Sequence, residues 1–163
     1  DLLSIDKIEE GNIIANKSTF DITKLVNSLC NELNGILRPG QELNYNHEGM
    51  EAVYLDPLSL KNTLLNLISN AIKFSPDNSV IRLTTKVSNG EFILKVTDEG
   101  LGIPKEDQKH LFERFFRGTN VTNIEGTGLG LHIVAKYVEL MNGRINVKSN
   151  TGTGTEFTII FKT

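Results

Sequence analysis

The segment PLSLKNTLLNLISNAIKF, residues 57–74, decides the fold because it is the clearest helix in the chain. It starts at Asp56-Pro57, a capping residue followed by a proline in the first turn, which is a strong helix start. At about 100° per residue, Leu64, Ile68 and Ala71 fall on one side and can pack against a sheet. The opposite side carries a polar stripe formed by Asn62, Asn66, Asn70 and Lys73.

The polar stripe has two interpretations. Asparagine is a poor helix former, and an ordinary exposed face would carry lysine and glutamate instead. Asn66 and Asn70 could therefore present amide oxygens to a hydrated magnesium ion, while Lys73 reaches a phosphate. A solvated polar face without a specific role explains the same residues equally well, so both interpretations stay open on this helix alone.

Helices and strands mix without regular alternation in the rest of the chain. Two further helices are predicted, Ile22–Leu37 with Asp21 as its cap and the strongly apolar Leu129–Met141. The predicted strands are Ser18–Ile22, Leu43–Asn46, Ala52–Leu55, Val80–Val87, Phe92–Thr97, Arg144–Ser149 and Thr155–Lys162. We expect an α+β two-layer sandwich in which helices cover one face of a mixed β-sheet.

Composition narrows the possible classes of function. The 163 residues, 39% of them hydrophobic, suit one globular domain. A net charge of -3 argues against non-specific nucleic-acid binding. The single cysteine, Cys30, excludes an internal disulfide, and no cluster of cysteine and histidine has zinc-binding spacing. An acidic domain that binds a polyanion has to concentrate its positive groups locally.

Two glycine-rich segments are candidates for a ligand site. Asp98 to Pro104 follow a predicted strand, where a carboxylate can accept a hydrogen bond from an exocyclic amine and glycines allow a flat ring to approach. An ordinary acidic turn explains this segment as well.

The second segment, Gly126–Leu131, opens directly into a predicted helix, whose free N–H groups favour a phosphate. It matches neither the dinucleotide fingerprint nor a Walker loop. The residues from Glu99 to Gly126 are expected to form a loop with short helical turns.

Five motifs resemble, in order and spacing, those of the ATP-binding catalytic domain of bacterial sensor histidine kinases. Asn66–Pro76 resembles their asparagine box, Asp98–Gly102 their first glycine box and Phe112–Arg117 their phenylalanine box. Gly126–Leu131 is similar to the second glycine box, and Gly152–Phe157 to the terminal Gly-Thr motif. Each motif is modest alone, but together they extend over most of the chain.

This resemblance implies the Bergerat-type ATP-binding fold and a set of site residues. Asn70 would be the main magnesium ligand, with Asn66 beside it as a second candidate, and Lys73 would contact phosphate. Asp98 would accept a hydrogen bond from the adenine amine, and Phe74 would flank the base. The other nucleotide-binding residues implied are Gly100, Gly102, Ile103, Phe115, Gly126, Thr127, Gly128, Leu129, Gly130, Leu131 and Thr155.

The resemblance also implies a catalytic set and a lid. Arg114 and Arg117 would lie near the γ-phosphate or the docking surface, and they complete the set with Asn66, Asn70 and Lys73. The segment Ile103–Glu125 would close over ATP as a lid.

Position 66 favours one reaction over its rivals. The same fold serves gyrase-type topoisomerases, mismatch-repair ATPases, heat-shock chaperones and protein-serine kinases, which usually carry a glutamate there as a general base. Asn66 cannot act as a base, which favours phosphoryl transfer to a histidine in two-component signalling. A protein-serine kinase or ATPase of the same fold, and a degenerate nucleotide-binding scaffold, remain alternatives.

No histidine of the chain fits the role of phosphoacceptor. His47 lies between predicted strands, His110 in the expected lid and His132 in the first turns of a helix. We therefore expect the acceptor upstream. Residues 1–16 resemble the C-terminal end of the dimerisation and phosphoacceptor helix with its linker, and residues 17–163 the catalytic domain. Because the chain starts at Asp1, we interpret it as a fragment of a longer protein.

The resemblance implies partners and a location as well. The expected partners are the upstream dimerisation and histidine-phosphotransfer domain and a response regulator receiver domain, with no nucleic acid among them. The parent protein would be a homodimer anchored in the inner membrane, and this domain would lie in the cytoplasm.

Overall fold

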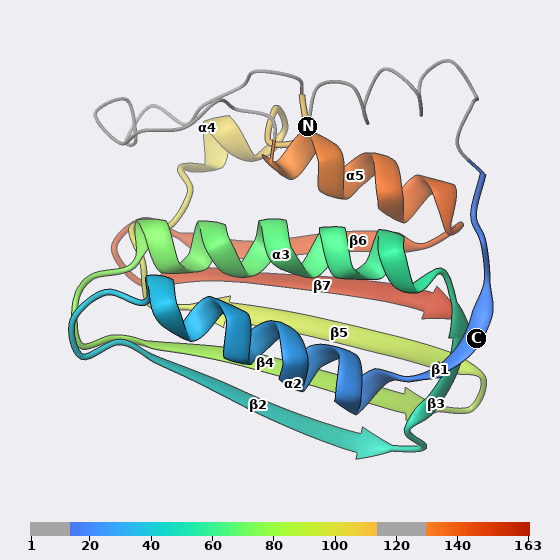
Figure 1. The fold of residues 1–163 in the computed structure, drawn as a ribbon. Coiled ribbons are helices and arrows are strands. Elements are labelled where there is room, and N and C mark those ends of the chain that lie inside the picture. Colours follow the sequence, from blue (N-terminus) through green and yellow to red (C-terminus); the bar gives the residue numbers. More distant parts are fainter. Residues whose placement is uncertain (1–13, 114–129) are drawn as a thin grey trace.

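Three helices lie side by side on one face of a five-stranded sheet in the computed structural model, which describes residues 14–113 and 130–163 (Figure 1). The strands follow the spatial order β2 (Glu42–Gly49), β4 (Val80–Ser88), β5 (Glu91–Asp98), β7 (Gly154–Lys162) and β6 (Arg144–Asn150). Strands β2 and β4 are parallel, and the other neighbours are antiparallel. The predicted two-layer sandwich with a mixed sheet is confirmed.

The helical layer consists of α2 (Ile22–Leu33), α3 (Pro57–Phe74) and α5 (Gly130–Leu140). A short helix, α4 (Lys105–Gln108), follows β5, and a 3-10 turn, η1 (Asn34–Ile36), follows α2. A separate pair of antiparallel strands is formed by β1 (Ser18–Asp21) and β3 (Ala52–Leu55). None of the helices in the described ranges is long and apolar enough to cross a lipid bilayer.

The hydrophobic core lies between the sheet and the helices. Leu64 and Ile68 of α3 have no exposed surface, as their predicted position on the inner side of this helix requires. Phe92 of β5 and Phe161 of β7 are also buried and stack with ring centroids 6.2 Å apart. Each fully buried side chain of this size contributes about 1.5–3 kcal/mol, so α3 is fixed firmly on the sheet.

Asp56 fixes the start of α3 and also holds the chain that enters the domain. Its Oδ1 accepts hydrogen bonds from Leu58 N and Ser59 N at 3.0 and 3.2 Å, as the predicted cap requires. Its Oδ2 accepts one from Asn16 N at 2.9 Å. The carboxylate is only 6% exposed, so these donors replace the water that it loses on folding.

Two predicted elements differ most from those observed. The helix from Ile22 ends at Leu33 rather than Leu37, because Asn34 and Gly35 are poor helix formers and the chain tightens there into η1. Strand β2 is longer than predicted because it pairs with β4 along its whole length. His47 therefore lies within a strand and not between two.

Candidate functional site

The asparagine stripe of α3 consists of Asn62, Asn66 and Asn70, the part of the predicted polar stripe that faces α5. Asn62 Nδ2 lies 3.2 Å from the hydroxyl of Tyr137 on α5, and Asn66 Nδ2 donates to the backbone oxygen of Asn62 at 2.7 Å. A Cβ added to Gly130, the first residue of α5, would lie 3.4 Å from Asn66 Oδ1 and 3.7 Å from Asn70 Oδ1. The two amides therefore lie directly against the N-terminal end of α5.

These amides fit the chemistry of a magnesium site. The nitrogen of Asn66 is engaged within α3, which leaves its oxygen available, and the Asn70 amide makes no hydrogen bond to any residue of the described ranges. Magnesium prefers oxygen ligands and keeps several waters, so two protein groups suffice. The same ranges hold no group of three or more histidine, cysteine or acidic side chains placed for a metal. Neutral amides bind a divalent cation weakly, so the phosphates would have to supply the negative charge.

Asp98 ends β5 with one oxygen engaged and one available. Its Oδ1 accepts hydrogen bonds from Gly100 N at 2.8 Å and Thr155 N at 3.2 Å. Its Oδ2 has no hydrogen-bond partner among the described residues. Burial raises the pKa of Asp98 above its ordinary value, while the two backbone N–H groups oppose that increase. The carboxylate is thus held rigidly with one acceptor oxygen open.

Two glycines let the loop after Asp98 approach its neighbours. A Cβ at Gly100 would lie 2.6 Å from the backbone oxygen of Phe74, which also accepts a hydrogen bond from Leu101 N at 3.3 Å. Gly102 has a φ of 72°, and a Cβ there would overlap the backbone oxygen of Asn150. The loop therefore fits between the end of α3 and the β6–β7 turn only with glycine at both positions.

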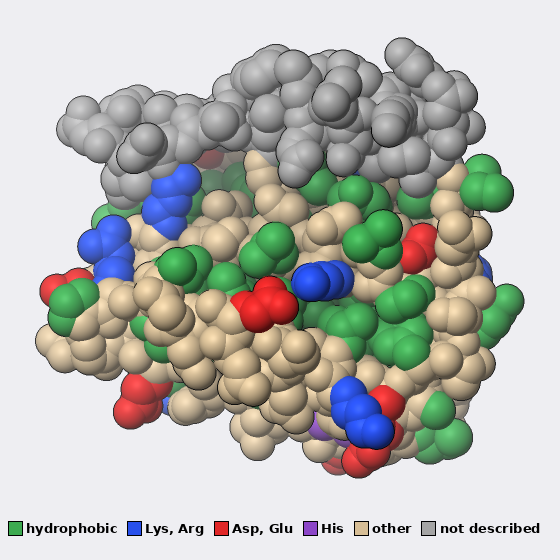
Figure 2. Space-filling model, in the orientation of Figure 1, with side chains coloured by type: hydrophobic (Ala, Val, Ile, Leu, Met, Phe, Trp, Pro, Cys, Tyr) green, Lys and Arg blue, Asp and Glu red, His purple; other side chains and the backbone are tan. Residues whose placement is uncertain are grey.

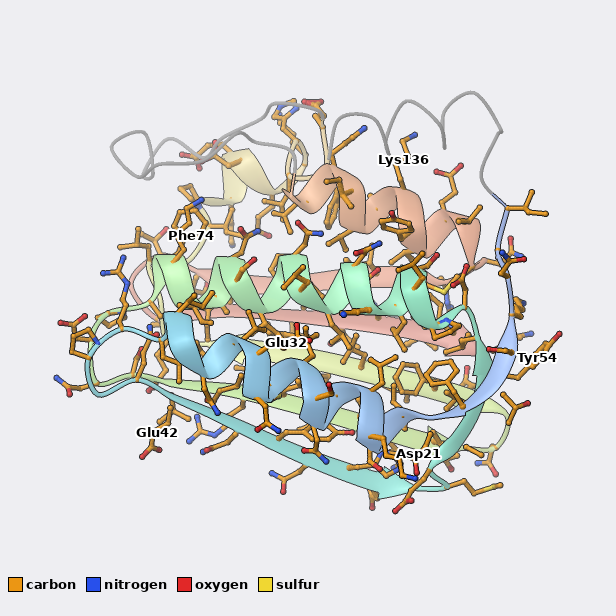
Figure 3. All side chains as sticks on the ribbon, viewed as in Figure 1. Asp21, Glu32, Glu42, Tyr54, Phe74 and Lys136 are labelled. Atoms are coloured by element: carbon orange, nitrogen blue, oxygen red, sulfur yellow. The ribbon has the colours of Figure 1, made fainter. Side chains whose placement is uncertain are left out.

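Phe74 lies at the C-terminal end of α3, on the side of α4 (Figure 3), and Lys73 precedes it in the last turn of the helix. Lys73 Nζ is 5.3 Å from the centroid of the Phe74 ring, a cation–π arrangement. Sequence reasoning missed the two side chains that hold this helix end. Gln41 Nε2 lies 3.1 Å from Ile72 O, and an Arg38 guanidinium nitrogen lies 2.9 Å from Lys73 O. They bind the carbonyl groups that a helix end leaves without partners.

Thr155, expected at the nucleotide, is 7% exposed and belongs to the same region as Asp98. Its hydroxyl lies 2.8 Å from that of Ser149, a residue that the sequence did not single out. A lone serine in a strand carries no signal of its own, because its significance comes from the β6–β7 pairing. Ile103 is held at the start of the expected lid by a bond from its N to Ser149 Oγ.

Some predicted site residues lie outside the described ranges. These are Arg114, Phe115, Arg117, Gly126, Thr127, Gly128 and Leu129, together with the greater part of the expected lid. Of the second glycine-rich segment, Gly130 and Leu131 are described, and they form the first turn of α5. The structure thus brings Asn66, Asn70 and Gly130 together, with Asp98, Gly100 and Phe74 grouped at the end of α3.

The helical face shows scattered charge. Figure 2 shows small groups of basic and acidic side chains on this face, with apolar and neutral side chains between the groups. The Lys61–Glu32 contact of 3.8 Å links α3 to α2 on this face. A continuous basic surface of the kind that binds nucleic acid is not seen in this view of the described residues.

The fold is that of an ATP-binding class of protein. A family model described as "Histidine kinase-, DNA gyrase B-, and HSP90-like ATPase" matches residues 55–163, and the chain belongs to this family. The match covers the asparagine stripe, Asp98 and the start of α5.

The relatives that the chain resembles are sensor histidine kinases. ArlS of Staphylococcus aureus, a signal transduction histidine-protein kinase, is 32% identical over 164 residues, which cover 99% of this chain and 36% of ArlS. The mycobacterial sensor histidine kinase MprB is 27% identical with a TM-score of 0.78, over 90% of this chain and 97% of that one. Full-length ShkA in complex with AMPPNP is 25% identical with a TM-score of 0.87, over 99% and 35%. The chain thus spans little more than a third of its curated relatives' length.

Proposed function

We propose that this domain binds Mg-ATP and transfers the γ-phosphoryl group to a histidine outside this chain, in two-component signal transduction. The observation that carries the proposal is the pair of amides, Asn66 and Asn70, placed against Gly130 at the start of α5. Metal ligands on one helix and an anion-binding helix start on another are what a nucleoside triphosphate requires. The resemblance to sensor histidine kinases supports a histidine as the acceptor of the phosphoryl group.

In this proposal the residues of the chain bind and orient the nucleotide and its metal ion, and none of them transfers a proton. Asn70 and Asn66 would hold magnesium, which when bound neutralises charge on the phosphate oxygens, and Lys73 would contact a phosphate. The neutral nitrogen of the acceptor imidazole forms a bond to the γ-phosphorus while the bond to the bridging oxygen breaks and ADP leaves. Asn66 stands where a hydrolase would need a base, and an amide cannot accept the proton of an attacking water.

The three histidines all have structural partners, which supports an acceptor outside this chain. His47 Nε2 lies 2.9 Å from the backbone oxygen of Met50, so that nitrogen carries the proton, and Nδ1 accepts from the Thr85 hydroxyl at 2.8 Å. His132 is 8% exposed, with Nδ1 3.0 Å from the backbone oxygen of Phe112. His110 Nδ1 lies 2.9 Å from a Glu113 carboxylate oxygen.

Calorimetry with ADP, in the presence and absence of magnesium chloride, tests the proposed function. We expect the chain to bind ADP more tightly with magnesium, and magnesium chloride alone to give no binding, since the amide ligands are neutral. Asn70→Ala should abolish the gain from magnesium and leave the fold intact, because this side chain makes no hydrogen bond within the described residues. Asn44→Ala, an exposed asparagine on β2, is the matched control and should bind as the parent does.

Two results would contradict the proposal. Absence of ADP binding under every condition would favour a degenerate scaffold. Steady ATP hydrolysis by the chain on its own would favour an ATPase, and would show that Asn66 does not prevent the activation of water.

A further inference from the structure

Ser149 of β6 is the centre of a hydrogen-bonded cluster beside Asp98. Its Oγ lies 2.7 Å from Ile103 N, 2.9 Å from Gly154 O and 2.8 Å from Thr155 Oγ1. Thr155 N in turn lies 3.2 Å from Asp98 Oδ1. One hydroxyl therefore connects the loop after β5, the β6–β7 turn and the residue that holds the Asp98 carboxylate.

When all three contacts of Ser149 are hydrogen bonds, the single proton of its hydroxyl assigns a direction to each. A serine hydroxyl has one proton and two lone pairs. Ile103 N–H can only donate and the carbonyl of Gly154 can only accept, so Ser149 receives a proton from Ile103 and gives its own to Gly154. One lone pair remains for Thr155. The Thr155 hydroxyl thus donates its proton to Ser149, and its own lone pairs stay available.

We propose that Ser149 determines the base selectivity of the site by holding the Thr155 hydroxyl as a hydrogen-bond acceptor beside Asp98. The Asp98 carboxylate also accepts only, so both side chains favour a base with an exocyclic amine. A 6-oxo base has an acceptor oxygen at the 6-position. This oxygen would face the acceptor oxygens of Asp98 and Thr155 with no proton between them. This inference rests on the proposed function, because it takes Asp98 as the group that receives the base.

Ser149 acts through Thr155 and is a positioning residue. Without its hydroxyl, the Thr155 proton is free to rotate toward a 6-oxo group, and the rejection of that base weakens. Because Thr155 is 7% exposed, its hydroxyl has little water with which to replace the lost partner. A purely structural role would change the binding of both kinds of base alike.

Calorimetry of the chain with magnesium and either ADP or inosine diphosphate separates these roles, since the two nucleotides differ at the 6-position of the base. We expect Ser149→Ala to lower the ratio of ADP affinity to inosine diphosphate affinity about fivefold to tenfold. Ser149→Thr keeps a hydroxyl and should restore the ratio. Thr153→Ala is the matched control, because that hydroxyl, 3.0 Å from Asn150 O, belongs to the same turn and should not affect the ratio.

A Thr155→Val chain provides the second measurement. Ser149→Ala should cause no further change in the ratio in that background, because the hydroxyl through which it acts is gone. The proposal is overturned if Ser149→Ala leaves the ratio unchanged or weakens both nucleotides equally. If the unsubstituted chain binds neither nucleotide, the proposed function fails first and this assignment fails with it.

Discussion

Asp98, the residue proposed to receive the base, lowers the stability of the fold. Its carboxylate is held by Gly100 N and Thr155 N, yet burial still raises its pKa. A carboxyl group whose pKa is higher in the folded state favours folding when protonated, and this contribution is lost as pH rises through the folded pKa. The ionised Asp98 therefore lowers stability at neutral pH.

Asp98→Asn should separate these two effects. An asparagine keeps an oxygen for Gly100 N and Thr155 N and removes the buried charge. We expect the variant to be at least as stable as the parent to urea at neutral pH, and to lose that advantage below the ordinary pKa of aspartate. It should bind ADP more weakly and prefer ADP to GDP less strongly than the parent does. An unchanged preference would show that Asp98 does not recognise the base.

The pH dependence of ADP binding provides an independent check on Asp98. An ionised carboxylate oxygen accepts a stronger hydrogen bond from the base than a protonated carboxyl does, so affinity should fall as pH is lowered toward the raised pKa of Asp98. The nucleotide phosphates also titrate, and Asp98→Asn supplies the baseline for them. A parallel decline in both chains would exclude Asp98 as the group responsible.

At the scale of residues, the sequence supports some assignments and misses others. Helical periodicity places Asn66 and Asn70, which are four residues apart, on the same face of α3, and this could be predicted from the sequence. Ser149 and Gln41 were not found, because their roles depend on β6–β7 pairing and on the approach of residues 38–41 to the end of α3. Contacts between segments so far apart in the chain leave no local pattern.

Among the elements, α3 has the bounds that its caps predict, Pro57–Phe74. The pairing of the strands was harder to predict from the sequence. Strand β2 pairs with β4 in parallel, whereas β3, the next strand after β2, pairs with β1. A parallel partner is set by the crossover between the strands, here through α3, and not by a turn motif. The C-terminal end of α3 likewise depends on a side chain from outside the helix, Gln41.

Gln41→Met should destabilise the end of α3. The Gln41 side chain is 6% exposed, its Nε2 lies 3.1 and 3.2 Å from Ile72 O and Ser75 O, and its Oε1 accepts from Arg38 N. Methionine fills similar space without a donor and leaves buried carbonyl groups unpaired, which costs about 1–3 kcal/mol. Urea unfolding measures this loss. The neighbouring Glu42→Ala, at an exposed position, should change stability by less than about 0.5 kcal/mol, and an equally small effect of Gln41→Met would contradict the role of Gln41.

At the scale of the whole molecule, the arrangement of the layers leaves the described histidines in structural roles. His47 lies in β2, bonded to Thr85 and to the turn after the strand. We therefore predict that the chain, incubated with magnesium and ATP labelled at the γ-phosphate, retains no label. The control is the same incubation with the dimerisation domain of the parent protein added, which should become labelled. Stable label on His47, His110 or His132 would show that the acceptor lies within this chain.

The Asp56 carboxylate has a mechanical consequence. It accepts from Asn16 N on the entering chain and caps α3 with its other oxygen. A helix of this length, roughly 27 Å at about 1.5 Å per residue, is stiff along its axis. A force applied to the chain at residue 16 therefore acts on the N-terminal end of α3, the helix that carries Asn66 and Asn70. Tension in the incoming chain and the alignment of those two amides are thus linked through the Asp56 carboxylate.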